Sequence, residues 1–475
     1  MNKFFPFLLI LFCSACAIGP NYKRNEFFSD EQIAQNLKIT NSTGKIVPAD
    51  WFKFLEDEKL DRLIKNALKN SPNINIAKEK LKQARYNLYM TNADLLPSFD
   101  INGEYVKSNP SKFSDLATKQ DYYQLGLDAS WEIDIWGGKR RLSESAMAML
   151  DSVSADFDNV KTVLISEISI AYLNWRLYQQ LAKETLINIA NQEHIFDTIK
   201  NKYNAGLVDT LVYNQAESLL KSTKQQLPQF LMNENKYLNV LSVLTGELAS
   251  DIKDEKSDIL NKSFSFDKAA LYDLPVNIIR NRPDVTASEQ QLVAQNALIG
   301  NKISNLLPAL SLEAFLGYQN STLSPIFNKD FNMYSNSIET IMPIFHWGKI
   351  INDIRAQKSV TKEALNNYKI AVLQAIADVS NSIKNVEESI ENYTLAKDNS
   401  ALYQNIAELS NTKYTQGLIA FSDFLDAEKD KISAQIQKHQ ALNDLLIQVI
   451  YFYKAIGGET RTNYSAQGDR KDCST

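Results

Sequence analysis

Four stretches of the chain alternate apolar and polar residues with a period of two, the pattern of β-strands that have a different environment on each face. Each stretch is roughly 10 to 14 residues long, enough to cross a membrane at a tilt. The apolar positions are, stretch by stretch, Phe99, Ile101 and Tyr105; Tyr123, Leu125, Leu127, Ala129, Trp131, Ile133 and Ile135; Leu310, Leu312, Ala314, Leu316 and Tyr318; and Tyr334, Ile338, Thr340, Met342 and Ile344. The pattern predicts two strand pairs, within residues 98–136 and 309–347.

The same alternation occurs in a soluble sheet with one wet face, which is the alternative interpretation. Aromatic residues near the strand ends, typical of girdles at a membrane interface, favour strands that cross a membrane. Four strands cannot close into a barrel, and an open edge in lipid leaves backbone groups unpaired at several kcal/mol each. Eight strands from a dimer would be filled by side chains, whereas twelve strands from a trimer leave a lumen. We therefore expect a transmembrane β-barrel that is completed by trimerisation, with four strands per protomer.

Two long stretches, 139–205 and 349–416, contain neither Gly nor Pro, and each would form a helix on the order of 100 Å long. A soluble antiparallel coiled coil is the alternative. However, each stretch directly follows an amphipathic strand, so strand and helix are expected to form one continuous wall. Apolar residues at coiled-coil spacing are Val372, Ile376, Val379, Ile383, Val386, Ile390 and Tyr393 in the second stretch and, less regularly, Ile165, Ile168, Tyr172 and Trp175 in the first. The predicted fold is mixed but mainly α, with a long coiled-coil α-helical barrel.

The chain contains this design twice, at a constant offset of 211 residues (283 − 72, 347 − 136, 417 − 206). The period is too long for a solenoid unit of about 20 to 50 residues. The clearest pairs are Asn70-Ser71-Pro72-Asn73 with Asn281-Arg282-Pro283-Asp284, Trp136-Gly137 with Trp347-Gly348, and Gly206-Leu207 with Gly417-Leu418. We predict a first repeat over 61–227 and a second over 272–438, an equatorial segment over 228–271 between them, and a helix end and polar tail over 439–475.

Each long helix is expected to stop at a glycine, because Gly206 and Gly417 permit the left-handed turn that ends a helix without steric cost. Beyond each glycine the chain resumes a helical pattern, towards residues 226 and 437. The sequence therefore predicts two helical hairpins whose tips lie on the order of 100 Å from the strands, in the periplasm if the strands lie in an outer membrane.

Composition and charge change the picture little. With 44% apolar and 23% charged residues the chain is expected to fold around cores. A net charge of −5 argues against nucleic acid as a partner, since the footprint of such binding is a basic patch.

The first residues have the features of a secretory signal peptide over 1–15. Lys3 gives a positive start, an apolar run follows to Phe12, and small residues precede Cys16. This arrangement resembles the lipobox of bacterial lipoproteins, although Cys13 stands where leucine is usual. We expect Cys16 to be acylated, with 16–60 as a lipidated segment and linker; the alternatives are ordinary cleavage and an unmodified buried thiol. Ala17 follows, rather than the aspartate that signals inner-membrane retention in many such lipoproteins, which favours the outer membrane.

Taken together, the chain resembles the outer-membrane factors of tripartite efflux pumps, the TolC-like outer-membrane efflux lipoprotein family. The matching segments are Cys16 with Gly19-Pro20-Asn21-Tyr22, Trp51-Phe52, 61–70, 134–139, Leu274-Pro275 with 280–284, both hairpin tips, and 454–458. The resemblance implies a homotrimer with a twelve-stranded barrel in the outer-membrane lipid, a twelve-helix periplasmic tunnel and an equatorial collar. It also implies two partners, a periplasmic adaptor protein and an inner-membrane efflux transporter of the RND type. The tips, with Gly206, Leu207, Gly417 and Leu418, would contact the adaptor.

The second tip carries the residues expected at the periplasmic aperture. Asp423 and Asp426 are three residues apart and share a helix face, at the position where this family places its aperture aspartates. Three copies would bring six carboxylates together, raise their pKa values and favour cations; two solvated surface acids are the alternative. Val212 occupies the position equivalent to Asp423 (423 − 211) and cannot form the polar contacts between hairpins that the family shows. Tyr414 could contribute a phenol to such contacts.

Enzymatic interpretations have little support. His194, His346 and His439 are scattered without the spacing of a zinc site, and we find neither a phosphate-binding loop nor a nucleophile elbow. We expect no enzyme activity, no metal and no cofactor beyond the covalent lipid on Cys16. The predicted function is a passive exit duct of a tripartite efflux pump; the alternatives are the outer-membrane duct of a type I protein-secretion system and a lipid-anchored coiled-coil scaffold.

Overall fold

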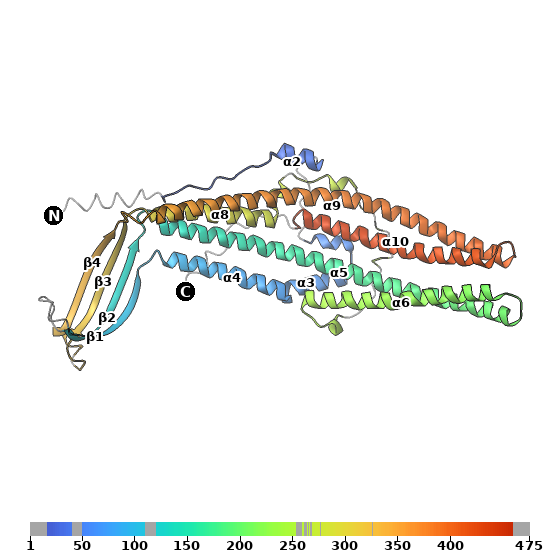
Figure 1. Cartoon of the computed structure of the whole chain (residues 1–475), viewed down its shortest axis with the longest axis horizontal. Helices are drawn as coiled ribbons and strands as arrows, with labels where there is room; N and C mark the ends of the chain where they lie inside the picture. Colours follow the sequence, from blue (N-terminus) through green and yellow to red (C-terminus); the bar gives the residue numbers. More distant parts are fainter. Residues whose placement is uncertain are drawn as a thin grey trace. The chain divides into compact units, whose positions relative to one another are not determined.

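A computed structural model describes residues 17–39, 50–109, 120–252, 259–260, 264, 266, 268–275, 277–324 and 326–458. Most of these residues are helical, and one four-stranded antiparallel sheet accompanies the helices (Figure 1). The chain divides into two compact units. One contains Lys80–Ser154 and Ala287–Lys369 with the segment that ends at Asn25, and the other contains Glu26–Glu79, Ala155–Thr286 and the chain from Ile370 onward.

The sheet belongs to the first unit and has the strand order β1-β2-β3-β4, so β1 and β4 are its edges. The strands are β1 (Ser98–Ser108), β2 (Gln120–Ile133), β3 (Ala309–Asn320) and β4 (Asn332–Ile341). The register places the predicted apolar residues on one face, with Ile101 opposite Leu127 and Leu127 opposite Leu316. Although apolar, this face is open, since Ile101 is 82% exposed and Leu316 is 64% exposed. The four predicted amphipathic strands are confirmed.

The ends of two predicted strands differ from the structure. β4 ends at Ile341, which pairs with Ala309, the first residue of β3. Met342 and Ile344 therefore lie beyond the strand, because no partner strand continues there and Pro343 has no N–H to donate to a ladder. Ile135 likewise follows the end of β2 at Ile133. Strand lengths are set by pairing, which the alternation of side chains does not encode.

The opposite face of the sheet is mostly polar, although it also carries apolar side chains such as Val106 and Met333. Phe315 lies there and is only 8% exposed. Its ring covers Gly126 and Gly317, which face each other across β2 and β3, and a Cβ at either glycine would overlap that ring. The two glycines thus leave room for an aromatic ring to lie flat on the backbone of the polar face.

The repeat is visible in the helix bounds. The helices are α2 (Asp30–Leu37), α3 (Glu58–Asn70), α4 (Pro72–Ala93), α5 (Gly138–Asn204), α6 (Thr210–Thr245), α7 (Ile278–Asn281), α8 (Pro283–Ser304), α9 (Lys349–Thr415) and α10 (Phe421–Ala455), with short 3-10 turns η1 (Trp51–Leu55), η2 (Ala249–Asp251), η3 (Lys268–Leu271) and η4 (Lys329–Phe331). α4 and α8, α5 and α9, and the starts of α6 and α10 are each offset by 211 residues (283 − 72, 349 − 138, 421 − 210).

The two long helices, α5 and α9, have 67 residues each, as the absence of Gly and Pro predicts. Most of their coiled-coil positions are buried, with Ile168 and Tyr172 in α5 and Val379 and Val386 in α9 fully inaccessible. Among the described residues, no helix combines the length and the apolar character that crossing a bilayer requires.

Side chains fix the junction from β2 to α5 in the first unit. The Asp134 carboxylate accepts hydrogen bonds from the backbone N–H groups of Lys139 and Arg140, at 3.0 Å each, as an acid does at the start of a helix. The Trp136 indole donates to the Pro308 carbonyl at 2.8 Å. These bonds tie the junction of the first repeat to the start of β3.

The Arg-Pro-Asp motif of the second unit has a structural role. The Arg282 side chain is 8% exposed and forms ion pairs with Asp284 at 2.7 Å and Asp378 at 3.0 Å. It also donates to the Ala455 carbonyl at 2.8 Å, which satisfies one of the last carbonyls of α10. Arg282 therefore joins the start of α8 to α9 and to the end of α10.

Candidate functional site: the helical hairpin tips

Both hairpins end in the same turn. Gly206 N–H donates to the Tyr203 carbonyl and Leu207 N–H donates to the Lys202 carbonyl, each at 2.9 Å, and the equivalent bonds recur at Gly417 and Leu418. This is the Schellman motif, which needs a left-handed residue after the helix. The φ angles of Gly206 and Gly417 are 71° and 75°, so the predicted role of both glycines in ending the helices is confirmed.

The tips leave their leucines exposed. In a Schellman motif the residue after the glycine often packs back on the helix, yet Leu207 is 74% exposed and Leu418 is 68% exposed. A Cβ at either glycine would meet nothing within 4 Å. The ends of both hairpins are therefore open surfaces with one apolar side chain each.

Below the tips the two hairpins of one chain pack together. Their shared core consists of Ile199 and Ala216 from the first hairpin and Phe421, Phe424 and Leu425 from the second. Residues that pack against this core are Ile195, Phe196, Val208, Val212, Leu219 and Tyr414. The contact between hairpins is thus apolar within a protomer.

Tyr414 is half buried at the edge of this core. Its ring stacks on Phe424, with centroids 5.5 Å apart and planes within 6°, and lies 5.3 Å from Phe421. Nζ of Lys202, from the first hairpin, lies 5.5 Å from the centre of the Tyr414 ring. The residue predicted for the aperture therefore takes part in a cation–π contact between hairpins, which sequence reasoning missed. The recurrence of Lys-Tyr at the two helix ends was the available signal.

Val212 also belongs to the contact between the two hairpins. It is half buried and packs on the shared core. Its backbone N–H donates a hydrogen bond to Oδ1 of Asp209, the N-cap of α6, at 3.0 Å. An aspartate at this position would bring a charge against the shared apolar core of the two hairpins. Packing thus gives a physical reason for the departure from the polar contacts expected at this tip.

Asp423 and Asp426 are both exposed, whereas Phe424 and Leu425 between them are buried. The helix of α10 therefore divides into an apolar side, packed in the hairpin core, and an acidic side that is open in the protomer. Six carboxylates around an axis remain a prediction, since they require three copies.

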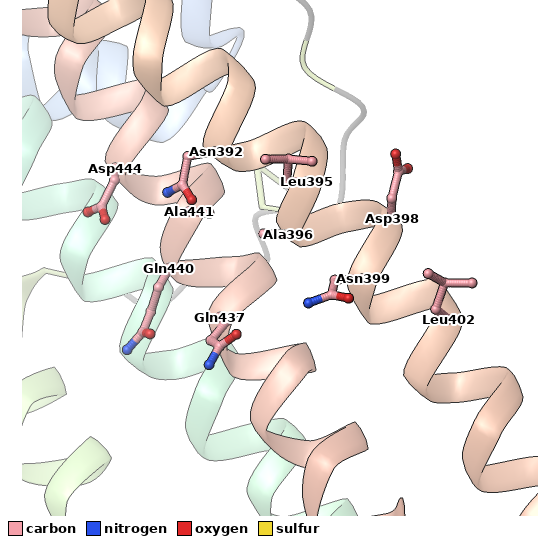
Figure 2. A pocket seen from close by; sticks show the side chains of 10 residues that line it. All are labelled: Asn392, Leu395, Ala396, Asp398, Asn399, Leu402, Gln437, Gln440, Ala441 and Asp444. Carbon is pink, nitrogen blue, oxygen red and sulfur yellow. The ribbon is translucent and has the colours of Figure 1, made fainter.

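Nearer the middle of the hairpin, α9 and α10 border a polar groove of about 550 Å³ that the sequence did not reveal (Figure 2). Amide and carboxylate side chains dominate its lining, and two leucines of α9 complete it. Burial raises the pKa of the Asp444 carboxyl above its ordinary value. The lining residues are Asn392, Leu395, Ala396, Asp398, Asn399, Leu402, Gln437, Gln440, Ala441 and Asp444.

The predicted lipidation residue, Cys16, lies outside the described residues, and Ala17 is the first residue that the structure describes. Within the described ranges, no group of three His, Cys, Asp or Glu side chains is arranged to hold a metal ion.

Comparison with known proteins matches both repeats. The family model of outer membrane efflux proteins matches residues 63–247 and 274–458, more than half of the chain. The two matches are offset by 211 residues at both ends (274 − 63, 458 − 247), the same offset as the helices. Each repeat of this chain therefore matches the family model separately.

Relatives cover nearly the whole chain. The cation efflux system protein CusC of Escherichia coli is 26% identical over 470 residues, 96% of this chain and 98% of that protein. The pyoverdine export outer membrane protein OpmQ of Pseudomonas aeruginosa is 25% identical over 86% of this chain and 87% of its own length. The crystal structure of the Campylobacter jejuni CmeC outer membrane channel has the same fold, with a TM-score of 0.83 at 23% identity over 94% of this chain and 96% of that one.

Proposed function

The chain belongs to the outer membrane efflux protein family, and from this premise we propose that three copies form the exit duct of a tripartite pump. The duct conducts small molecules passively from a periplasmic adaptor and an inner-membrane transporter, of the RND type, to the exterior. Cys16 carries a covalent lipid that anchors each protomer in the outer membrane, and the duct performs no catalysis.

One observation supports the trimer above all others. The sheet of one chain has two edge strands, β1 and β4, and an apolar face on which Ile101 and Ile338 are 82% and 74% exposed. In lipid that face is buried, but the edges must pair with other strands. Three sheets joined edge to edge give twelve strands and a lumen.

The acidic side of α10 supports a selective entrance. Asp423 and Asp426 do not take part in the hairpin core, so their charges are available to a pore axis. Three copies would favour cations and offer multivalent cations a site at which to block the current.

Planar-bilayer recording tests the duct. Purified trimers should carry current, and the double change Asp423→Ala with Asp426→Ala should lower the cation preference and weaken block by multivalent cations. Asp430→Ala, another exposed acid of the same helix, is the matched control and should change neither. A double variant that carries no current would argue against a duct, and unchanged selectivity would remove the two aspartates from the aperture.

The exposed leucines support docking of the adaptor at the tips. Changing Leu207 and Leu418 to Ser should reduce cross-linking to the adaptor and export in cells, while trimers remain. Leu248→Ser, at the other end of α6 and 70% exposed, is the control. Equal cross-linking in both variants would place the adaptor elsewhere.

The lipid anchor has a separate test. Cys16→Ser should abolish lipid labelling yet leave trimers in the membrane, because burial of the barrel supplies most of the membrane affinity and one lipid supplies little. Trimers missing from the membranes of this variant would contradict that division.

A further inference from the structure

Residues 17–24, here termed the N-terminal strap, lie along α8 in the first unit. The Asn296 side chain donates to the Pro20 carbonyl at 2.9 Å. Further along the strap, the Tyr22 hydroxyl donates to Glu289 at 3.1 Å and Arg24 forms an ion pair with the same carboxylate at 2.8 Å. α8 thus fixes the strap at two levels.

The start of the strap is bound by one arginine of α5. Nε of Arg141 donates to the Ile18 carbonyl at 3.0 Å, and Nη2 donates to the carbonyls of Ala17 at 3.2 Å and Gly19 at 3.4 Å. Nη2 also lies 2.7 Å from Oδ1 of Asn21. The Arg141 side chain is 4% exposed, so the strap covers it. A guanidinium has a rigid fork of donors, and here most of its bonds go to strap backbone.

Glycines let the backbones meet at this place. Gly19 has a φ of 101°, a conformation that favours glycine, and lies against Gly300 of α8. A Cβ at Gly300 would overlap the Ile18 carbonyl and the Arg141 side chain. Ile18 N–H donates to the Trp136 carbonyl at 3.0 Å, which places the start of the strap at the junction from β2 to α5.

We propose that Arg141, with Gly300 opposite it, forms a binding site for the first residues of the mature chain and thereby fixes where the lipid anchor leaves the protein. Arg141 is a positioning residue: it holds Ala17 at Trp136, one peptide bond from Cys16. The acyl chains then enter the bilayer beside the end of β2 rather than on a loose tether. The second step rests on the proposed lipidation of Cys16.

Cleavage by trypsin measures how readily the strap leaves its binding site. The strap contains two trypsin sites, Lys23 and Arg24, and a bound segment must detach before it is cut. In reconstituted trimers, Arg141→Ala should speed release of the peptide that ends at these residues about tenfold or more, since hydrogen bonds from a charged group are lost. Cleavage at sites outside the strap should keep its rate. Equal release from the wild type and the variant would overturn the proposal.

Two further variants separate the site from general damage. Gly300→Ala keeps the guanidinium of Arg141 in the chain but places a Cβ against the Ile18 carbonyl and the Arg141 side chain, and should also release the peptide faster. Arg140→Ala is the matched control, because Arg140 pairs with Asp134 instead, and should release it at the wild-type rate. Faster cleavage throughout the chain in the first two variants would reduce Arg141 to a general folding role.

The link to the lipid is tested by combining variants in lipid vesicles. Cys16→Ser should lower the temperature at which trimers dissociate when Arg141 is present, and should lower it much less in the Arg141→Ala background. An equal decrease in both backgrounds would show that the anchor does not act through Arg141. If Cys16→Ser still takes up lipid label, the lipidation proposal fails, whereas the trypsin result still decides whether the strap site exists.

Discussion

Nε2 of His439 lies 2.8 Å from Oε1 of Glu184, in a contact that joins α10 to α5. His439 is 2% exposed, and its Nδ1 has no hydrogen-bond partner among the described residues. The imidazole is therefore held on one side only, by a carboxylate from the neighbouring hairpin.

This contact predicts a pH dependence of stability. Burial is the largest single influence on the pKa of the Glu184 carboxyl and raises it. The hydrogen bond and charge of His439, with smaller contributions from Gln180 and Lys438, together outweigh burial and lower the pKa below the ordinary 4.5. A lowered carboxyl pKa stabilises the fold above the ordinary value, and the contribution is lost as the pH falls through the lowered value. Glu184→Gln should reduce the free energy of unfolding by about 1 kcal/mol at neutral pH, as measured by chemical denaturation in detergent. The difference from wild type should shrink as the pH falls below the ordinary pKa and vanish below the lowered pKa, and a constant difference across pH would contradict the assignment.

Position 212 should not tolerate a charged side chain. Val212→Asp places a carboxylate against the hairpin core, and we expect it to loosen both tips and raise hydrogen exchange of the amides around Tyr414 and Phe424. Val212→Ala, which removes volume but adds no charge, should have a smaller effect. Protection that rises in the aspartate variant would show that a polar contact between hairpins replaces the apolar one.

Gly417 should be required for its backbone angle alone. Gly417→Ala forces an alanine into the left-handed region at a cost of about 1 kcal/mol, so exchange of the Leu418 amide should rise several-fold. Gly417→Asn should lie closer to wild type, because asparagine tolerates this conformation. Equal exchange in the alanine variant and the wild type would mean that the tip can turn in another way.

The guanidinium of Arg282, which holds several N–H donors in a fixed plane, should be needed for stability. Arg282→Lys keeps the charge but cannot reach Asp284, Asp378 and the Ala455 carbonyl together. We expect a loss of about 2 kcal/mol in the free energy of unfolding and fraying of the last turn of α10, visible by hydrogen exchange. Lys454→Arg, a change in the same turn, serves as the control.

Local patterns predicted the elements well. The strand alternation around Ile101 and Leu316, the long helices without Gly or Pro, and the stops at Gly206 and Gly417 are all determined by residues close in sequence. The count of four strands predicted the barrel that three chains complete, and Ala17 favoured the outer membrane. The family resemblance added the adaptor and transporter partners.

Contacts between residues far apart in the sequence could not be predicted from the sequence. The stacking of Tyr414 on Phe424 and the contact of Lys202 from the other hairpin depend on how two helical hairpins meet. The binding of Ile18 by Arg141 joins residues 123 apart in sequence. No spacing rule connects such pairs, because burial and register, rather than periodicity, bring them together.

The offset of 211 residues has a consequence for symmetry. Three chains of two repeats would present six nearly equivalent hairpins, so the backbone of the tunnel approaches sixfold symmetry. At the tips of such a trimer Asp423 would alternate with the apolar Val212, so the electric field there would have only threefold symmetry. A ligand or ion at the periplasmic end of the tunnel would therefore meet acidic and apolar surfaces in alternation, although the backbone around it is nearly sixfold symmetric.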